Sequence, residues 1–130
     1  MDTATAQLIT AAKSVCGRFQ LTEDFSAGSV GAAILTAEGS IYTGICIDLG
    51  CGLGFCAEPA AMAEMLKHRE THISAVAAVS KDRLLPPCGR CREMMVQLDV
   101  RNLDCQVIVG EGEVARLRVL LPKHWLVQST

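Results

Sequence analysis

The stretch FCAEPAAMAEMLKHRE, residues 55–70, decides how the chain can fold. Its alanine, methionine and leucine residues favour a helix, and Pro59 is tolerated in a helix only within the first turn. The helix is therefore predicted to begin at about Cys56. It follows a glycine-rich loop, DLGCGLGF at 48–55, and precedes HISAVAAVS at 72–80, an apolar run typical of a buried strand.

The segments on either side extend this alternation of helices and strands. Apolar residues at helical spacing predict a helix over 3–19, and SVGAAILTAEGSIYTGICI at 29–47 predicts two strands around a turn at 38–39. After two prolines, CGRCREMMVQL at 88–98 predicts another helix, and CQVIVG at 105–110 predicts another strand. This order implies a mixed sheet with helices packed on it. No repeat, low-complexity tract or linker interrupts the pattern, so we expect a single domain over residues 1–130.

Composition and charge exclude several function classes. The net charge is −2 and no block of lysine and arginine occurs, so we expect no nucleic acid polymer as partner. No apolar run is long enough to span a bilayer, and the opening MDTATAQLIT lacks the features of a signal peptide. We therefore expect a cytoplasmic protein that does not bind a membrane.

The chain has seven cysteines, and in the cytosol clustered thiols more often serve metal binding or catalysis than disulfides. Three of them are predicted to stand at the N-terminal ends of two helices, where free N–H groups and the helix dipole favour thiolates. The other four are expected to be small buried side chains: Cys16, Cys46, Cys51 and Cys105.

The three helix-terminal cysteines form a candidate metal site. Cys88 and Cys91 lie in one helical turn, and Cys56 can meet them if the two helices start side by side. Three protein ligands leave the fourth tetrahedral position open, which is typical of catalytic zinc. Glu58 stands close to this ligand set, where a carboxylate can transfer protons.

The same cysteines fit two other kinds of site. A structural zinc site would need a fourth protein ligand, which Cys51 or Cys46 could supply. Alternatively, Cys88-x-x-Cys91 taken alone fits a redox pair, although no thioredoxin-like context surrounds it. The glutamate beside Cys56 favours catalytic zinc over both.

Cys56-Ala-Glu58 followed by Pro-Cys88-x-x-Cys91 resembles the signature of the zinc-dependent cytidine deaminase superfamily. The likeness extends over most of the chain, through SAGSVGAAILTAEGSIYTG at 26–44 and RVLLP at 118–122. The resemblance implies a three-layer α/β/α sandwich with a mixed, roughly five-stranded sheet. It also implies one Zn²⁺ per chain and a homotetramer or dimer. With a cysteine as the first ligand, the chain resembles the small three-cysteine branch of the superfamily. Within that branch, it resembles blasticidin-S deaminase somewhat more than ordinary cytidine deaminase.

What the resemblance implies is hydrolytic deamination of a small amino-heterocycle by water. Zinc would activate the water, and Glu58 would carry its proton to a ring nitrogen and then to the leaving ammonia. Because Pro59 replaces the arginine usual in the family, Arg90 or Arg92 is expected to offset the thiolate charge. The candidate substrate-binding residues are Phe25, Cys46, Asp48, Ala57 and Trp125.

Departures from the family pattern guide the substrate expectation. Cys46 and Asp48 stand where ordinary cytidine deaminases bind ribose through an Asn-x-Glu pair, and Gly28 stands in place of a phenylalanine. We therefore expect cytidine to be a weak substrate, and a free base, an aminotriazine or a modified nucleoside to be preferred. The alternatives are blasticidin-S deaminase, ordinary cytidine or deoxycytidine deaminase, and a zinc-stabilised binding protein without turnover.

Overall fold

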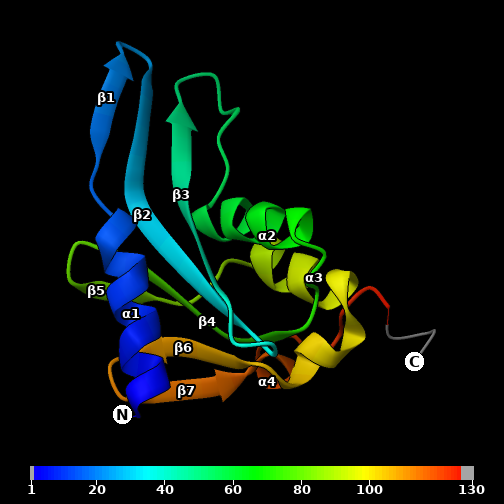
Figure 1. The fold of residues 1–130 in the computed structure, drawn as a ribbon. Helices are drawn as coiled ribbons and strands as arrows, with labels where there is room; N and C mark the ends of the chain where they lie inside the picture. Colours follow the sequence, from blue (N-terminus) through cyan, green and yellow to red (C-terminus); the bar gives the residue numbers. More distant parts are fainter. Residues whose placement is uncertain (1, 127–130) are drawn as a thin grey trace.

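The computed structural model describes residues 2–126, in which helices cover both faces of a seven-stranded sheet (Figure 1). The elements in chain order are α1 (Thr3–Val15), β1 (Phe19–Thr22), β2 (Phe25–Thr36), β3 (Ile41–Leu49), α2 (Ala57–Lys67), β4 (Ile73–Ser80), β5 (Arg83–Leu85), α3 (Gly89–Leu98), the 3-10 helix η1 (Val100–Asp104), β6 (Gln106–Gly110), β7 (Glu113–Arg116) and α4 (Leu117–Leu120). None of the helices described is long and apolar enough to cross a membrane.

The sheet is built around the long strand β2. It pairs antiparallel with β1, β3 and β4, and β4 pairs in turn with β5 and β6. The β4–β6 pair is parallel, and the connection between these two strands contains α3. Parallel neighbours need such a crossover, which explains why a helix stands between them in the chain.

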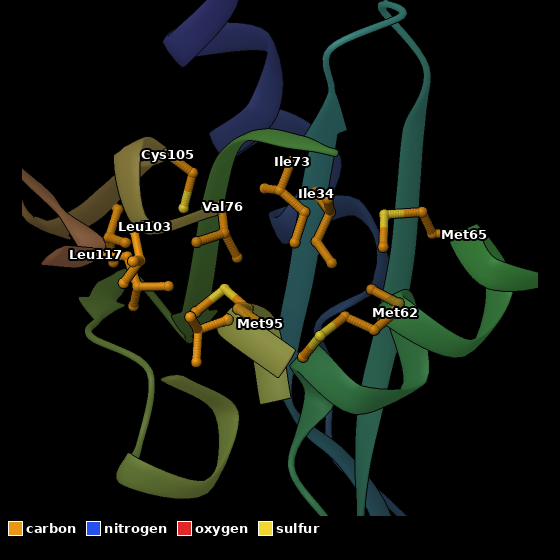
Figure 2. Close-up of a cluster of buried hydrophobic side chains, with 12 residues drawn as sticks. Ile34, Met62, Met65, Ile73, Val76, Met95, Leu103, Cys105 and Leu117 are labelled. Atoms are coloured by element: carbon orange, nitrogen blue, oxygen red, sulfur yellow. The ribbon is translucent and has the colours of Figure 1, made fainter. Parts of the chain in front are cut away.

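Each face of the sheet has its own apolar core. On one face, α1 packs Leu8, Ile9 and Ala12 against small side chains of β2 and β4. On the other face, α2 and α3 contribute three methionines, Met62, Met65 and Met95, which pack against side chains that include Ile34 and Val76 (Figure 2). The predicted three-layer α/β/α sandwich is therefore confirmed.

The number of strands is larger than predicted, seven instead of about five. The three short strands β1, β5 and β7 contain only three or four residues each. All four residues of β1 are exposed, so it has no alternation of buried and exposed positions from which a strand can be predicted.

Two boundaries also differ from the prediction. The first helix ends at Val15 because Cys16 adopts an extended conformation, and Phe19 begins β1 instead of ending the helix. Strand β3 continues to Leu49, so Asp48 belongs to a strand and not to the glycine-rich loop. The type of the segment RLRVLLPKHW, residues 116–125, is not evident from the sequence, and it contains the short helix α4.

Strand β2 has a bulge beside the functional site. The β2–β3 register passes from Ala27 opposite Ile47 to Gly31 opposite Ile45, so residues 28–30 face a single residue of β3. Gly28 has a φ of +84°, which favours glycine. Its carbonyl oxygen accepts a hydrogen bond from the N–H of Gly17 at 2.8 Å.

Gly28→Ala is expected to lower the free energy of unfolding. A Cβ atom at this position would lie 2.4 Å from the backbone oxygen of Gly17, in addition to the strain of a positive φ. Gly39→Ala is the matched control, because Gly39 has a φ of +93° but no atom within 4 Å of the added Cβ. Urea unfolding should show that Gly28→Ala costs ~1–3 kcal/mol more than Gly39→Ala. Equal losses would contradict the tight packing of the bulge.

Candidate active site

The three predicted cysteines stand at the N-termini of α2 and α3. Cys56 is the N-cap of α2, and Cys88 is the N-cap of α3. Neither side chain caps its helix by a hydrogen bond, although N-cap side chains commonly do so, and both sulfurs are therefore left for other partners. Cys91 lies in the first turn of α3 and is fully buried.

The three sulfur atoms form a compact group. The Sγ atom of Cys88 lies 3.4 Å from the Sγ atoms of both Cys56 and Cys91. All three lie within 4.8 Å of one another. Zinc–sulfur bonds of ~2.3 Å in tetrahedral geometry separate sulfurs by roughly 3.8 Å, so a small outward movement fits them to one ion. Within residues 2–126, no other Cys, His, Asp or Glu completes this group, so the structure gives no fourth protein ligand.

The electrostatics of the group also call for a cation. Burial raises the pKa of Cys56 and that of Cys91. Burial acts to raise the pKa of Cys88 as well, but hydrogen bonds from the backbone N–H groups of Cys91 and Arg90 and from the neighbouring thiols lower it overall. Three thiolates cannot gather in a partly buried site unless a positive charge offsets them. A divalent metal ion supplies that charge, and sulfur ligands suit zinc.

Glu58 lies in the first turn of α2, two residues after Cys56, and is only 4% exposed. Burial raises the pKa of its carboxyl group. A carboxyl group with a raised pKa exchanges its proton more readily near neutral pH, which suits it to general acid–base chemistry. Its place next to the sulfur group puts this function beside the candidate metal.

A cavity of about 460 Å³ opens in front of Glu58 and the sulfur group. This volume is within the range of small-molecule sites. Cys56, Ala57 and Cys88 line the end next to Glu58, and β2 and β3 supply a wall that includes Cys46 and Asp48. Three of the five predicted substrate-binding residues, Cys46, Asp48 and Ala57, are thus brought to one cavity.

The other two predicted substrate contacts lie elsewhere. Phe25 lines a separate hollow with Leu49 and Cys51. Trp125 is largely exposed, and its backbone N–H donates to Glu93 on α3. Neither side chain lines the cavity of its own chain, so their contact with substrate stays a prediction.

The two arginines predicted to offset the thiolate charge have different surroundings. Arg90 is exposed and lines the cavity. Arg92 donates from Nε to the carbonyl oxygen of Pro87 and from Nη1 to that of Leu120. The geometry thus favours Arg90 for the role at the sulfur group, whereas Arg92 holds the segment before α3 in place.

The four remaining cysteines are not all buried. Cys46 and Cys105 are buried and Cys16 is partly so, but Cys51 is exposed, which corrects the prediction for that residue. Its place in the glycine-rich loop that follows β3 accounts for this exposure. All seven cysteines are free thiols, and Cys105 has a pKa raised to about 12 by burial.

Sequence reasoning missed the polar residue Ser29 in the cavity wall. Little signal was available, because the predicted strand began at Ser29, so that Gly28, which has a positive φ in the bulge, lay outside the predicted strand. The bulge places Ser29 and Val30 together opposite Cys46.

Comparison with known proteins gives consistent matches. A sequence model of the cytidine and deoxycytidylate deaminase zinc-binding region matches residues 3–107. The cytidine deaminase of Halalkalibacterium halodurans is 35% identical over 104 residues, which cover 75% of this chain and 77% of that protein. The crystal structure of cytidine deaminase from Mycobacterium tuberculosis has a TM-score of 0.78 at 27% identity, covering 95% of this chain and 98% of that one. Cytidine deaminase from Burkholderia pseudomallei has a TM-score of 0.73 at 26% identity, covering 96% and 100%.

Proposed function

Because this chain belongs to the cytidine and deoxycytidylate deaminase zinc-binding family, we propose that it hydrolyses cytidine or deoxycytidine and releases ammonia. It is an enzyme of the hydrolytic deaminase class. The observation that carries the proposal is the buried Glu58 carboxyl next to three clustered cysteines in one cavity.

The substrate expectation from the sequence is revised. Cys46 and Asp48 suggested a free base or a modified nucleoside, but the relatives reported above are cytidine deaminases. They therefore favour the ordinary cytidine deaminase alternative. Cys46 and Asp48 affect individual contacts to the substrate, whereas the residues for the chemistry, among them Cys56, Glu58 and Cys88, line the same cavity.

We assign the sulfur atoms of Cys56, Cys88 and Cys91 as the ligands of one zinc ion. A bound zinc ion lowers the pKa of water and so supplies a nucleophile at neutral pH. Glu58 takes the proton from the attacking water and delivers it to the ring nitrogen, while a C–O bond forms at the amino-bearing carbon. Glu58 then takes the proton of the new hydroxyl group on that carbon and gives it to the departing amine, so that the carbonyl group forms as the C–N bond breaks. The balance is one water consumed and one ammonia released.

The test is a substrate panel with zinc-loaded protein. The kcat/KM for ammonia release is measured with cytidine, deoxycytidine, cytosine, isocytosine, an aminotriazine and blasticidin S. We expect cytidine and deoxycytidine to have the highest values. A higher value for cytosine or blasticidin S would contradict the proposed substrate, although not the deaminase chemistry.

Arg90→Ala is expected to weaken zinc binding. Three thiolates on Zn²⁺ leave one net negative charge, and Glu58 adds another. Of the described residues that line the cavity, Arg90 is the only cation. Loss of such a supporting charge costs ~10-fold in metal affinity, measured by competition with a chelator. Arg83→Ala, an exposed arginine on β5, is the control, and equal affinities in both variants would exclude this role for Arg90.

We also propose that the chain assembles with copies of itself, as a homotetramer or a dimer. Phe19, Leu21 and Leu53 are exposed large apolar side chains, which supports association. The mass of the protein in solution tests this proposal, and a monomer at micromolar concentration would contradict it.

A further inference from the structure

The bulge in β2 shapes the polar part of the cavity wall. Residues 28–30 stand opposite Cys46 alone, and Ser29 and Val30 both line the cavity. In a regular antiparallel ladder, successive residues alternate between the two faces of the sheet, whereas a bulge re-aims side chains locally. The bulge therefore brings a hydroxyl group to the cavity at a position that a regular strand would not predict.

Cys46 has its hydrogen-bonding capacity largely occupied by this bulge. The N–H of Val30 donates to its Sγ atom at 3.3 Å, and the Oγ atom of Ser29 lies 3.2 Å from the same sulfur. The thiol of Cys46 also lies 3.7 Å from Oδ2 of Asp48. Because a thiol has one weak donor and a weakly accepting sulfur, Cys46 has little capacity left for a ligand.

Ser29 is different because a hydroxyl group has one donor and two acceptor lone pairs. Because the Cys46 thiol donates to Asp48, the Ser29 O–H donates to the Cys46 sulfur, and the lone pairs of the Ser29 oxygen remain free to accept a hydrogen bond from a ligand in the cavity. Ser29 is half-buried, so this acceptor is partly shielded from water. A hydrogen bond to a ligand there replaces few bonds to water.

The position of Ser29 fits the sugar of a nucleoside. The amino-bearing carbon of the substrate must lie at the end lined by Cys56 and Glu58. The sugar is attached to another ring atom, away from that carbon, and extends toward the remaining polar wall. That wall holds Ser29 and Asp48, which offer a hydroxyl and a carboxylate to sugar hydroxyl groups.

We propose that Ser29 is a specificity-determining residue that hydrogen-bonds the 2′- or 3′-hydroxyl group of the substrate's sugar, next to Asp48. The proposal rests on the proposed nucleoside deaminase function. Ser29 contacts the sugar and not the reacting carbon, so its loss affects substrate binding more than the chemical step.

Ser29→Ala tests the proposal with two substrates, cytidine and 2′,3′-dideoxycytidine. We expect a ~3- to 10-fold lower kcat/KM for cytidine, caused by a higher KM at unchanged kcat, as loss of one neutral hydrogen bond gives. The kcat/KM for the dideoxynucleoside, which lacks both ring hydroxyl groups of the sugar, should not change. Ser29→Thr keeps the hydroxyl group and should keep the wild-type ratio between the substrates. Ser14→Ala, on the exposed side of α1, is the matched control.

The outcomes separate this inference from the proposed function. No ammonia from cytidine with the wild-type protein would overturn the proposed function and this inference together. If the wild type deaminates cytidine, but Ser29→Ala lowers kcat/KM for both substrates equally or for neither, only the inference about Ser29 is overturned. If Ser29→Ala does not fold, Ser29→Thr is the test. A lower ratio of kcat/KM for cytidine to kcat/KM for the dideoxynucleoside in this variant would contradict the hydroxyl contact.

Discussion

Replacing Glu58 with glutamine is expected to lower kcat for cytidine by ~10²- to 10⁴-fold, the usual contribution of a general acid–base group. Glutamine has nearly the same shape and keeps the buried position, but it cannot accept and return a proton. Glu58 is 4% exposed and lies two residues from Cys56, so no other described carboxylate in the cavity is equally placed. Zinc content and the free energy of unfolding should remain close to those of the wild type.

Glu64→Gln is the matched control, because Glu64 lies on the same helix outside the cavity and forms an exposed ion pair with Lys67. This variant should keep the wild-type rate. Ammonia release and zinc content are measured on the same preparations. A Glu58→Gln protein that deaminates cytidine within a few-fold of the wild type would exclude Glu58 as the proton carrier.

Replacing Cys91 with alanine is expected to abolish the stabilisation of the protein by zinc. Zinc bound to the native state stabilises it by about 4 kcal/mol when free zinc exceeds Kd by 1,000-fold. Cys91→Ala removes one of three ligands from a fully buried position. The difference in unfolding free energy between zinc-saturated and chelator-treated protein should therefore be large in the wild type and close to zero in this variant.

Cys105→Ala separates loss of zinc from loss of packing. Cys105 is also a buried cysteine, with 3% exposure, but it lies outside the sulfur group. Its replacement should lower the unfolding free energy of the zinc-free protein. The difference in unfolding free energy between zinc-saturated and chelator-treated protein should stay as in the wild type. The assigned ligands would be contradicted if Cys91→Ala protein still held one zinc per chain and gained as much unfolding free energy from zinc as the wild type.

Much of the site could be predicted from the sequence because its signals are local. Pro59 can only stand in the first turn of a helix, and this fixes the helix start at Cys56. The prolines before Cys88 mark the start of α3 in the same way. Once both helices pack on the same face of the sheet, their N-termini meet and the three sulfurs gather there.

The parts that could not be predicted depend on pairing between distant residues. The bulge at 28–30 arises from the register of β2 against β3, so the position of Ser29 in the cavity is not a property of its neighbours in sequence. The short strand β5 forms because β4 offers it a partner, and three residues are too few to show a pattern. The relatives favour cytidine over the free base or modified nucleoside that single positions such as Cys46 suggested.

The most direct test of the account is ammonia release from cytidine by protein that holds one zinc ion per chain. We expect ammonia and uridine in equal amounts, and loss of both when a chelator removes the zinc. Zinc-loaded, folded protein that binds cytidine but releases no ammonia would contradict the account, and would indicate a zinc-stabilised binding protein in place of an enzyme.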